Sequence, residues 1–193
     1  AWCWKAGNGT TVNNDGTIQS TVSANRDAGF SIVSFTSNGT AGATVGHGLD
    51  SAPEMIIGKN RDRTYHWAVY NRDNGAANGL RLNTTDGNLS GFLNSTEPSS
   101  TLVTLGTYDL NMEAGDNQMM YCWHSVEGYS KIGSYKGNGN ADGPFVYLGF
   151  KPAWVMFKTT GTNSWCILDN KRDTTNPVDR YLLADGNDVE GTS

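Results

Sequence analysis

Short apolar runs separated by polar turns recur along the whole chain. Several alternate apolar and polar residues, as in Thr17–Val22, while others are short continuous apolar runs, as in Met55–Ile57. Runs this short fit β-strands rather than helices, and no helical period persists beyond about two turns. We expect strands at residues 17–22, 30–35, 55–57, 66–70, 119–123, 131–135, 145–148, 154–157 and 165–168.

Turn signals lie between these runs. Asn-Gly occurs five times and Asp-Gly four times, for example at Asn38-Gly39 and Asp86-Gly87. Both pairs suit hairpin turns, because Asn, Asp and Gly tolerate positive φ. Repeated short strands joined by such turns predict an all-β fold of antiparallel β-sandwich units, of the jelly-roll or concanavalin/lectin-like kind.

The chain also contains an internal repeat, in which residues 31–39 resemble residues 131–139. The matching positions there are Ile32 with Ile132, Ser34 with Ser134, Phe35 with Tyr135, and Asn38-Gly39 with Asn138-Gly139. Further matches are Gly48-Leu49 with Gly149-Phe150, Pro53 with Pro152, Lys59 with Lys158, Trp67 with Trp165, and Arg72-Asp73 with Arg172-Asp173. Such self-similarity predicts a duplicated unit with shared core positions. The expected core residues are Ile32, Phe35, Trp67, Ile132, Tyr135 and Trp165, with Met55 or Ile57 in the first copy and Val155 or Phe157 in the second.

The repeat divides the chain into tandem parts. Residues 29–125 form the first predicted sandwich repeat, and residues 126–193 form a truncated second one that lacks a counterpart of Leu89–Trp123. The opening Trp2-Cys3-Trp4 resembles Tyr121-Cys122-Trp123. Residues 1–28 are therefore expected to be the end of a preceding unit followed by a polar connector, within a longer parent chain.

Composition narrows the function classes. The chain has 24 Gly, 14 Lys and Arg, and a formal net charge of -5. The chain contains no run of basic residues that would indicate nucleic-acid binding. It also has no apolar segment long enough to cross a bilayer. The three cysteines, Cys3, Cys122 and Cys166, lack zinc-ligand spacing and are expected to be buried, unpaired side chains.

One segment has the spacing of a cation site. Asn138, Asn140 and Asp142 alternate in a Gly-rich loop, as in the first part of a calcium-binding loop, but the distal bidentate Glu is absent. The acidic stretch Asp109–Asp116 has a similar oxygen-rich pattern. A plain turn is the competing interpretation for both, and no cofactor is expected.

Aromatic residues near predicted loops are candidate sugar-binding groups. Tyr65, His66, Tyr70 and Tyr129 could stack on the faces of sugar rings, whereas Trp67 recurs as Trp165 and is expected in the core. No catalytic residues are expected. His47 lies between glycines without the nucleophile and orienting carboxylate of a catalytic His, and the acidic residues are mostly in turn motifs.

The chain resembles repeats in virion structural and tail-fibre-like proteins of marine bacteriophages. The residues that carry this resemblance are Gly29–Phe35, Asn38–Thr40, Val45–Leu49, Pro53, Lys59–Arg61, Trp67–Tyr70, Tyr121–Tyr129 and Gly143–Tyr147. It implies a virion surface protein with jelly-roll or lectin-like units and supplies no catalytic residues.

From this resemblance we expect a tail fibre or appendage protein located on the virion. Its expected partners are other virion proteins, a homo-oligomer (a trimer by analogy with fibres) and a host-surface glycan. A capsid decoration or assembly protein is the first alternative, and a polysaccharide depolymerase is the second. The depolymerase would need two carboxylates about 5 to 10 Å apart in a cleft.

Overall fold

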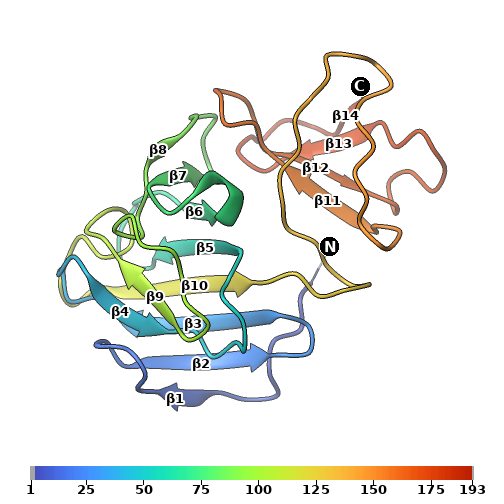
Figure 1. The fold of residues 1–193 in the computed structure, drawn as a ribbon. Coiled ribbons are helices and arrows are strands. Elements are labelled where there is room, and N and C mark those ends of the chain that lie inside the picture. Colours follow the sequence, from blue (N-terminus) through green and yellow to red (C-terminus); the bar gives the residue numbers. More distant parts are fainter. Residues whose placement is uncertain (1–2, 193) are drawn as a thin grey trace.

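An eight-stranded antiparallel sheet is the largest sheet of the molecule (Figure 1). The computed structural model describes residues 3–192, and this range contains no α-helix, which confirms the predicted all-β class. The strands of the large sheet lie in the order β1 (Thr11–Asn13), β2 (Ser20–Asn25), β3 (Phe30–Thr36), β10 (Asn117–Trp123), β5 (Met55–Asn60), β6 (Ala68–Asn71), β7 (Asn78–Arg81) and β8 (Leu89–Ser90). A short 3-10 turn, Arg72–Asn74, joins β6 to β7. None of the described residues belongs to a helix with the length and hydrophobicity of a membrane span.

Two smaller sheets accompany it. One pairs β4 (Ala43–Gly46) with β9 (Leu102–Leu105), and the other contains β11 (Trp154–Phe157), β12 (Cys166–Asp169), β13 (Arg180–Leu183) and β14 (Gly191–Thr192). Residues 3–125 are called the N-terminal lobe below, and residues 126–192 the C-terminal lobe. Figure 1 shows the C-terminal sheet to one side of the large sheet, beyond β6 and β7.

Strand β10 lies between β3 and β5 and follows the alternation of its sequence. Gln118, Met120 and Cys122 are fully buried on one face, whereas Met119 and Tyr121 are half-buried on the other. A side-chain period of two places each set on one side of the sheet. The two faces of β10 therefore contact different parts of the molecule.

The main core lies on the first of these faces. There the β4–β9 pair and the loops around Phe92 and Leu110 cover the large sheet, and Val33, Val103 and Leu105 are fully buried. Burying each such side chain contributes about 1.5–3 kcal/mol. This cluster is the dominant stabilising feature of the N-terminal lobe.

The C-terminal lobe docks on the opposite face. Trp165 is buried together with Ile57, Val69 and Leu80 of the large sheet. Its indole Nε1–H donates a hydrogen bond to the carbonyl of Arg81 at 2.8 Å. Trp165 therefore links the two lobes through both packing and a directed hydrogen bond.

Strands β5–β8 and β11–β14 have the same order and register; we call them the first and second meanders. Met55, Ile56, Ile57 and Gly58 pair with β6 as Trp154, Val155, Met156 and Phe157 pair with β12. The remaining rungs also correspond, because Val69↔Leu80 matches Ile167↔Leu182, and Asn78↔Ser90 matches Arg180↔Thr192.

Loop hydrogen bonds repeat as well. The Trp67 N–H donates to Asn83 Oδ1 at 3.0 Å, and the Trp165 N–H donates to Asp185 Oδ1 at 2.8 Å. The carbonyls of the two tryptophans accept from Leu82 and Ala184, at 3.0 and 3.1 Å. The two tryptophans therefore occupy corresponding positions, and both pack in the same hydrophobic cluster between the lobes.

Three expectations from the sequence are corrected. The polar connector expected within residues 1–28 contains β1 and β2, and its Ile18 and Val22 are buried in the main core. The expected strands at 131–135 and 145–148 are absent. In the N-terminal lobe β10 lies between β3 and β5 and pairs with both. The C-terminal lobe has no counterpart of β10 between residues 131–135 and β11. Residues 131–135 therefore have no neighbouring strand with which to form a ladder.

The six predicted core residues differ in how deeply they are buried. Phe35 and Trp165 are buried, whereas Ile32, Trp67 and Ile132 are half-buried. Tyr135 is 57% exposed, so its assignment to the core is wrong. Its counterpart Phe35 is buried because β3 is covered by the β4–β9 layer, which residues 131–135 lack.

Candidate functional site

The outer side of the second meander is an uncovered apolar surface. Val155 and Phe157 alternate with inward-facing residues on β11, and their partners Leu168 and Cys166 lie on the same side. Val155 and Phe157 are 37% and 36% exposed, and their two partners are half-buried. These four residues, together with the loop residues described next, are called the C-terminal surface.

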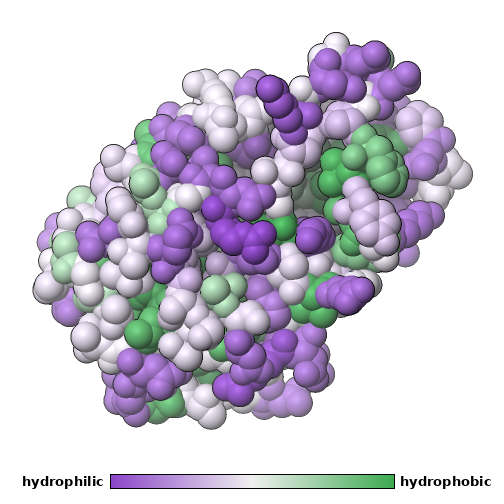
Figure 2. Space-filling view, viewed as in Figure 1, coloured by the Kyte–Doolittle hydropathy of each residue, from purple (hydrophilic) through white to green (hydrophobic). Residues whose placement is uncertain are grey.

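The segment of the C-terminal lobe before β11 adds exposed aromatic side chains to this surface. Phe145 is 92% exposed and Tyr147 is 79% exposed, and Tyr135 and Val146 are also exposed. Seven of the eleven exposed large hydrophobic residues in the described range lie between residues 129 and 157, so they are concentrated in this part of the sequence. Figure 2 shows hydrophobic side chains gathered over the C-terminal lobe. Concentrated exposed apolar residues are typical of interaction sites.

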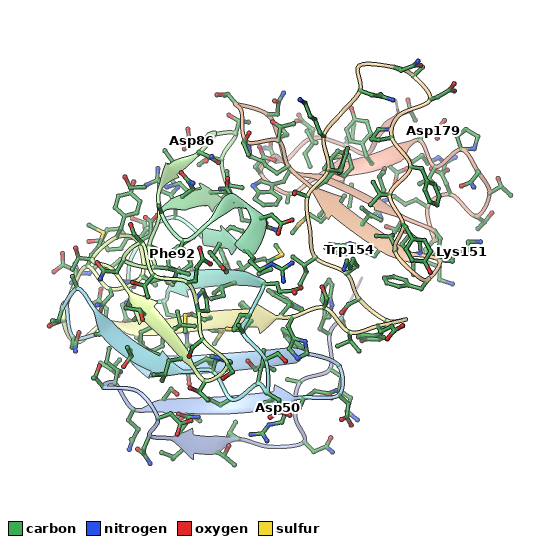
Figure 3. All side chains as sticks on the ribbon, viewed as in Figure 1. Asp50, Asp86, Phe92, Lys151, Trp154 and Asp179 are labelled. Atoms are coloured by element: carbon green, nitrogen blue, oxygen red, sulfur yellow. The ribbon has the colours of Figure 1, made fainter. Side chains whose placement is uncertain are left out.

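A groove of about 370 Å³ opens on the same lobe. Val155 and Leu168 supply apolar lining, and Trp154, labelled in Figure 3, lines the groove at the start of β11. Polar lining residues are Lys151, Asp169, Asn170, Asp173, Thr174, Thr175 and Asn176. A concave apolar site with a few polar groups has the composition of a ligand site.

The two carboxylates of the groove already have partners. Asp169 accepts from the N–H groups of Lys171 and Arg172 and pairs with the Arg172 guanidinium. Asp173 accepts from the N–H groups of Asp179 and Arg180, at 3.0 and 2.7 Å. Both side chains organise the loop between β12 and β13, as turn acidic residues do.

The corresponding surface of the first meander is covered. Ile56, Ala68 and Tyr70 occupy the positions of Val155, Cys166 and Leu168, and all three are buried in the main core. Leu110 lies so close to Gly58 that an added Cβ would be 2.3 Å from its side chain. The two meanders therefore differ in what covers them.

The four aromatic residues predicted to bind sugars do not form one site. Tyr70 is buried, and its hydroxyl donates to Glu97; burial and this hydrogen bond raise the pKa of Tyr70. Its predicted sugar contact is wrong, because its strand is covered on that side by the main core. Tyr65 and His66 are half-buried in the loop after β5, where Tyr65 donates to Glu113 at 3.3 Å. Tyr129 is exposed after the end of β10, at the opposite end of the β5–β10 ladder.

The predicted calcium loop is organised by its own side chains. Asn138 Oδ1 accepts from the N–H of Asn140 at 3.0 Å, and Asn140 Oδ1 accepts from the N–H of Asp142 at 3.1 Å. These are consecutive Asx turns, so two side-chain oxygens of the predicted cage already accept hydrogen bonds from backbone N–H groups. Within residues 3–192, no three His, Cys, Asp or Glu side chains are grouped to hold a metal ion.

The acidic stretch 109–116 holds the N-terminal lobe together. Asp116 accepts from Arg63 Nε at 2.6 Å and from Asn60 Nδ2 at 2.8 Å. The hydrogen bond from Arg63, followed by that from Asn60, lowers the pKa of Asp116. Asn111 is buried and accepts from the N–H groups of Asn38 and Gly39. These groups anchor the loops at one end of the sheet.

His47 and the cysteines have structural surroundings. His47 is buried, its Nδ1 accepts from the Leu49 N–H at 3.3 Å, and its Nε2 lies 3.2 Å from the Ser99 carbonyl. Burial lowers the pKa of His47, which favours the neutral ring. Cys122 is buried, and burial raises its thiol pKa to about 12. Cys166 is half-buried, but Cys3 is exposed, contrary to expectation, because it precedes the first strand.

Comparison with protein families gives one match. Residues 1–193 match the family described as "Domain of unknown function (DUF7483)". The chain belongs to this family. No curated protein and no solved structure was found to match the DUF7483 chain significantly.

Sequence reasoning missed the C-terminal surface of this DUF7483 chain. Residues 145–148 have the composition of a strand, so Phe145 and Tyr147 were expected to pair within a sheet. The missing counterpart of Leu89–Trp123 was the available signal. In the N-terminal lobe the part of that segment after β8 supplies β9 and β10, so its absence implies an unpaired strand edge and an uncovered face in the second meander.

Proposed function

We propose that this DUF7483 chain is a non-catalytic β-structural module of a larger assembly, of the kind found in bacteriophage tail fibres and related appendages. The observation that carries this proposal is the uncovered C-terminal surface beside a corresponding meander whose surface is buried. The resemblance to marine-phage virion proteins is the reason for proposing a bacteriophage appendage as this assembly. In this proposal the chain derives from two copies of one lectin-like β-sandwich unit, of which the second lacks its covering layer.

The engaged carboxylates of the groove support binding rather than hydrolysis. A glycosidase needs one carboxyl group to donate a proton and a second to act as base or nucleophile. Asp169 and Asp173 are instead held by arginines and backbone N–H groups. We therefore place the function in assembly and adhesion.

Immunogold electron microscopy on purified phage particles tests the role. Antibody raised against this chain should label tails or their appendages. Labelling confined to the head would support a capsid decoration protein instead. Particles that contain the chain by immunoblot but carry no accessible label on tail or head, or particles that lack it, would contradict the appendage proposal.

Contact with a host-surface glycan is a second candidate function, favoured by the groove. Asn170 and Asn176 offer amide groups beside the apolar Val155 and Leu168, a combination of the kind that holds sugar rings. Calorimetric titration with host polysaccharide fragments should show binding that Leu168→Trp abolishes by filling the groove. Val189→Trp, at an exposed position that does not line the groove, is the matched control. Equal binding by both variants would exclude the groove.

A further inference from the structure

The outward edge of β11 corresponds to an edge that is paired in the N-terminal lobe. β5, the counterpart of β11, pairs with β6 on one side and with β10 on the other, from Gln118↔Asn60 to Trp123↔Met55. β11 pairs with β12 on the corresponding inner side and is the last strand of its sheet. The second meander therefore has an open position where the first has β10.

The backbone pattern shows which groups face this open edge. The Asn170 N–H donates to the Ala153 carbonyl at 3.0 Å, across the Trp154↔Asp169 pair. In an antiparallel ladder this marks Trp154↔Asp169 as a non-hydrogen-bonded pair. The N–H and C=O groups of Trp154 and Met156 therefore point away from β12, toward the open edge, while those of Val155 face β12.

Between the flanking Pro152 and Lys158, β11 itself carries none of the devices that block strand addition. Proline, charge and bulges protect exposed edges, but β11 consists of Trp154, Val155, Met156 and Phe157. The other edge strands, β1, β8 and β14, have two or three residues each. β11 is the longest edge strand of the two larger sheets and is wholly apolar.

One side chain already occupies the expected track. Cys3-Trp4 repeats Cys122-Trp123, the end of β10. The Trp4 ring lies 5.1 Å from Trp154 in a T-shaped contact, and Trp123 is the strand partner of Met55, the counterpart of Trp154. A tryptophan therefore lies at the same end of the edge strand in both meanders.

We propose that the open edge of β11 binds an added strand of the β10 type, supplied by another unit of the DUF7483 family. Such a strand has the pattern of Asn117–Trp123 and runs antiparallel to β11, and its tryptophan displaces Trp4 from its contact with Trp154. Main-chain hydrogen bonds supply its affinity, and alternate side chains set its register. Phe157 is the counterpart of Gly58, against which Leu110 packs in the N-terminal lobe. The Phe157 side chain takes the space that Leu110 fills there. The added element is therefore the edge strand and not a copy of the whole β4–β9 layer. This inference rests on the proposed assembly role and names its partner.

A peptide binding experiment tests it on the full chain. The probe is a synthetic peptide with the sequence of residues 116–124 carrying Cys122→Ser, and a scrambled peptide is the control. The chain variants are Met156→Ala and Met156→Pro, which both shorten the side chain, but only proline removes the N–H at the open edge. We expect the wild type and Met156→Ala to bind the peptide, and Met156→Pro to bind it at least about tenfold more weakly.

Amide hydrogen exchange locates the bound peptide. The Met156 N–H should slow on peptide addition, while the Val155 N–H, already paired with β12, should change little. Equal binding by the Ala and Pro variants, no binding of the probe, or binding without protection of Met156 would each overturn the proposal. Dimerisation of the chain that protects Met156 while β10 stays paired with β3 and β5 would overturn it too, because the added strand would then not be of the β10 type. Particle labelling is an independent readout, so a labelled tail with a failed peptide test would remove only the strand partner.

Discussion

The two meanders compare a covered and an uncovered version of one arrangement. They share strand order, register and the side-chain acceptor for the tryptophan N–H. In the first, β10 pairs with the edge and the main core buries the outer face; in the second, both are open. Local hydrogen bonding and turn chemistry therefore specify the meander, whereas its neighbours decide whether its apolar face is buried.

The largest expected effect separates Trp165 from its counterpart Trp67. Trp165→Ala removes a buried side chain between the lobes and should cost about 3–5 kcal/mol in unfolding free energy. Trp67→Ala should cost about half as much, because Trp67 is half-buried and its removal takes away less buried apolar surface. Urea denaturation followed by circular dichroism measures both.

Trp165→Phe serves as the control for the indole hydrogen bond. It keeps an aromatic ring but loses the N–H that donates to the Arg81 carbonyl. Its loss in unfolding free energy should therefore lie between zero and that of Trp165→Ala. Equal losses for Trp165→Ala and Trp67→Ala would show that the two positions are not distinguished by burial.

A second pair compares the outer faces directly. Ile56→Ala should cost about 2–4 kcal/mol, because it leaves a cavity in the main core. Val155→Ala, at the corresponding uncovered position, should change stability by less than about 1 kcal/mol. Thermal unfolding of both variants provides the measurement. A loss for Val155→Ala as large as that for Ile56→Ala would mean that the C-terminal surface is covered in the free chain.

A third pair tests the shared acceptor. Asp185→Ala leaves the N–H of buried Trp165 without its acceptor and should cost about 1–2 kcal/mol. Asn83→Ala should cost less, because Asn83 is exposed and water replaces it. The exchange Asp185→Asn keeps an acceptor oxygen and installs the residue type used at Asn83. Chemical denaturation should find it close to wild type, and a loss equal to that of Asp185→Ala would refute the shared role.

The smallest effect concerns pH and belongs to the covered lobe. His47 is buried there, whereas Leu148 occupies the corresponding place in the repeat. The folded pKa of His47 is below its unfolded value of 6.5. At pH values between the folded and the unfolded pKa, the unfolded chain therefore binds more protons than the folded chain. This contribution to stability is complete above pH 6.5 and is lost as pH falls below it.

Comparison with His47→Gln isolates the titration of this side chain. The melting temperature of the wild type should fall more steeply from pH 7 to 5.5 than that of the variant. Parallel pH profiles would assign the acid sensitivity to other groups.

The repeated pattern of residues predicted much of this fold and little of its surface. The strands around Phe30–Phe35, Met119–Trp123 and Trp154–Phe157 follow from short apolar runs between turns, because side-chain period and turn chemistry are local properties. The alignment of Trp67 with Trp165 also identified two positions with the same hydrogen bonds.

What failed depended on distant neighbours. Residues 131–135 match β3 in sequence, yet they form no strand because no counterpart of β10 is beside them. β1 lies in a stretch of polar residues whose pairing with β2 the local pattern does not reveal. Tyr70 follows a loop but is buried, because β9 and its adjoining loops cover that face. Neighbour-dependent burial is what a linear pattern does not encode.

Amide hydrogen exchange of Ile57 and Met156 in the free chain tests the central comparison most directly. These residues occupy the same position in the two meanders, with their N–H groups on the side away from β6 and β12. We predict strong protection of Ile57, which faces β10, and fast exchange of Met156. Protection of Met156 equal to that of Ile57 would contradict the account.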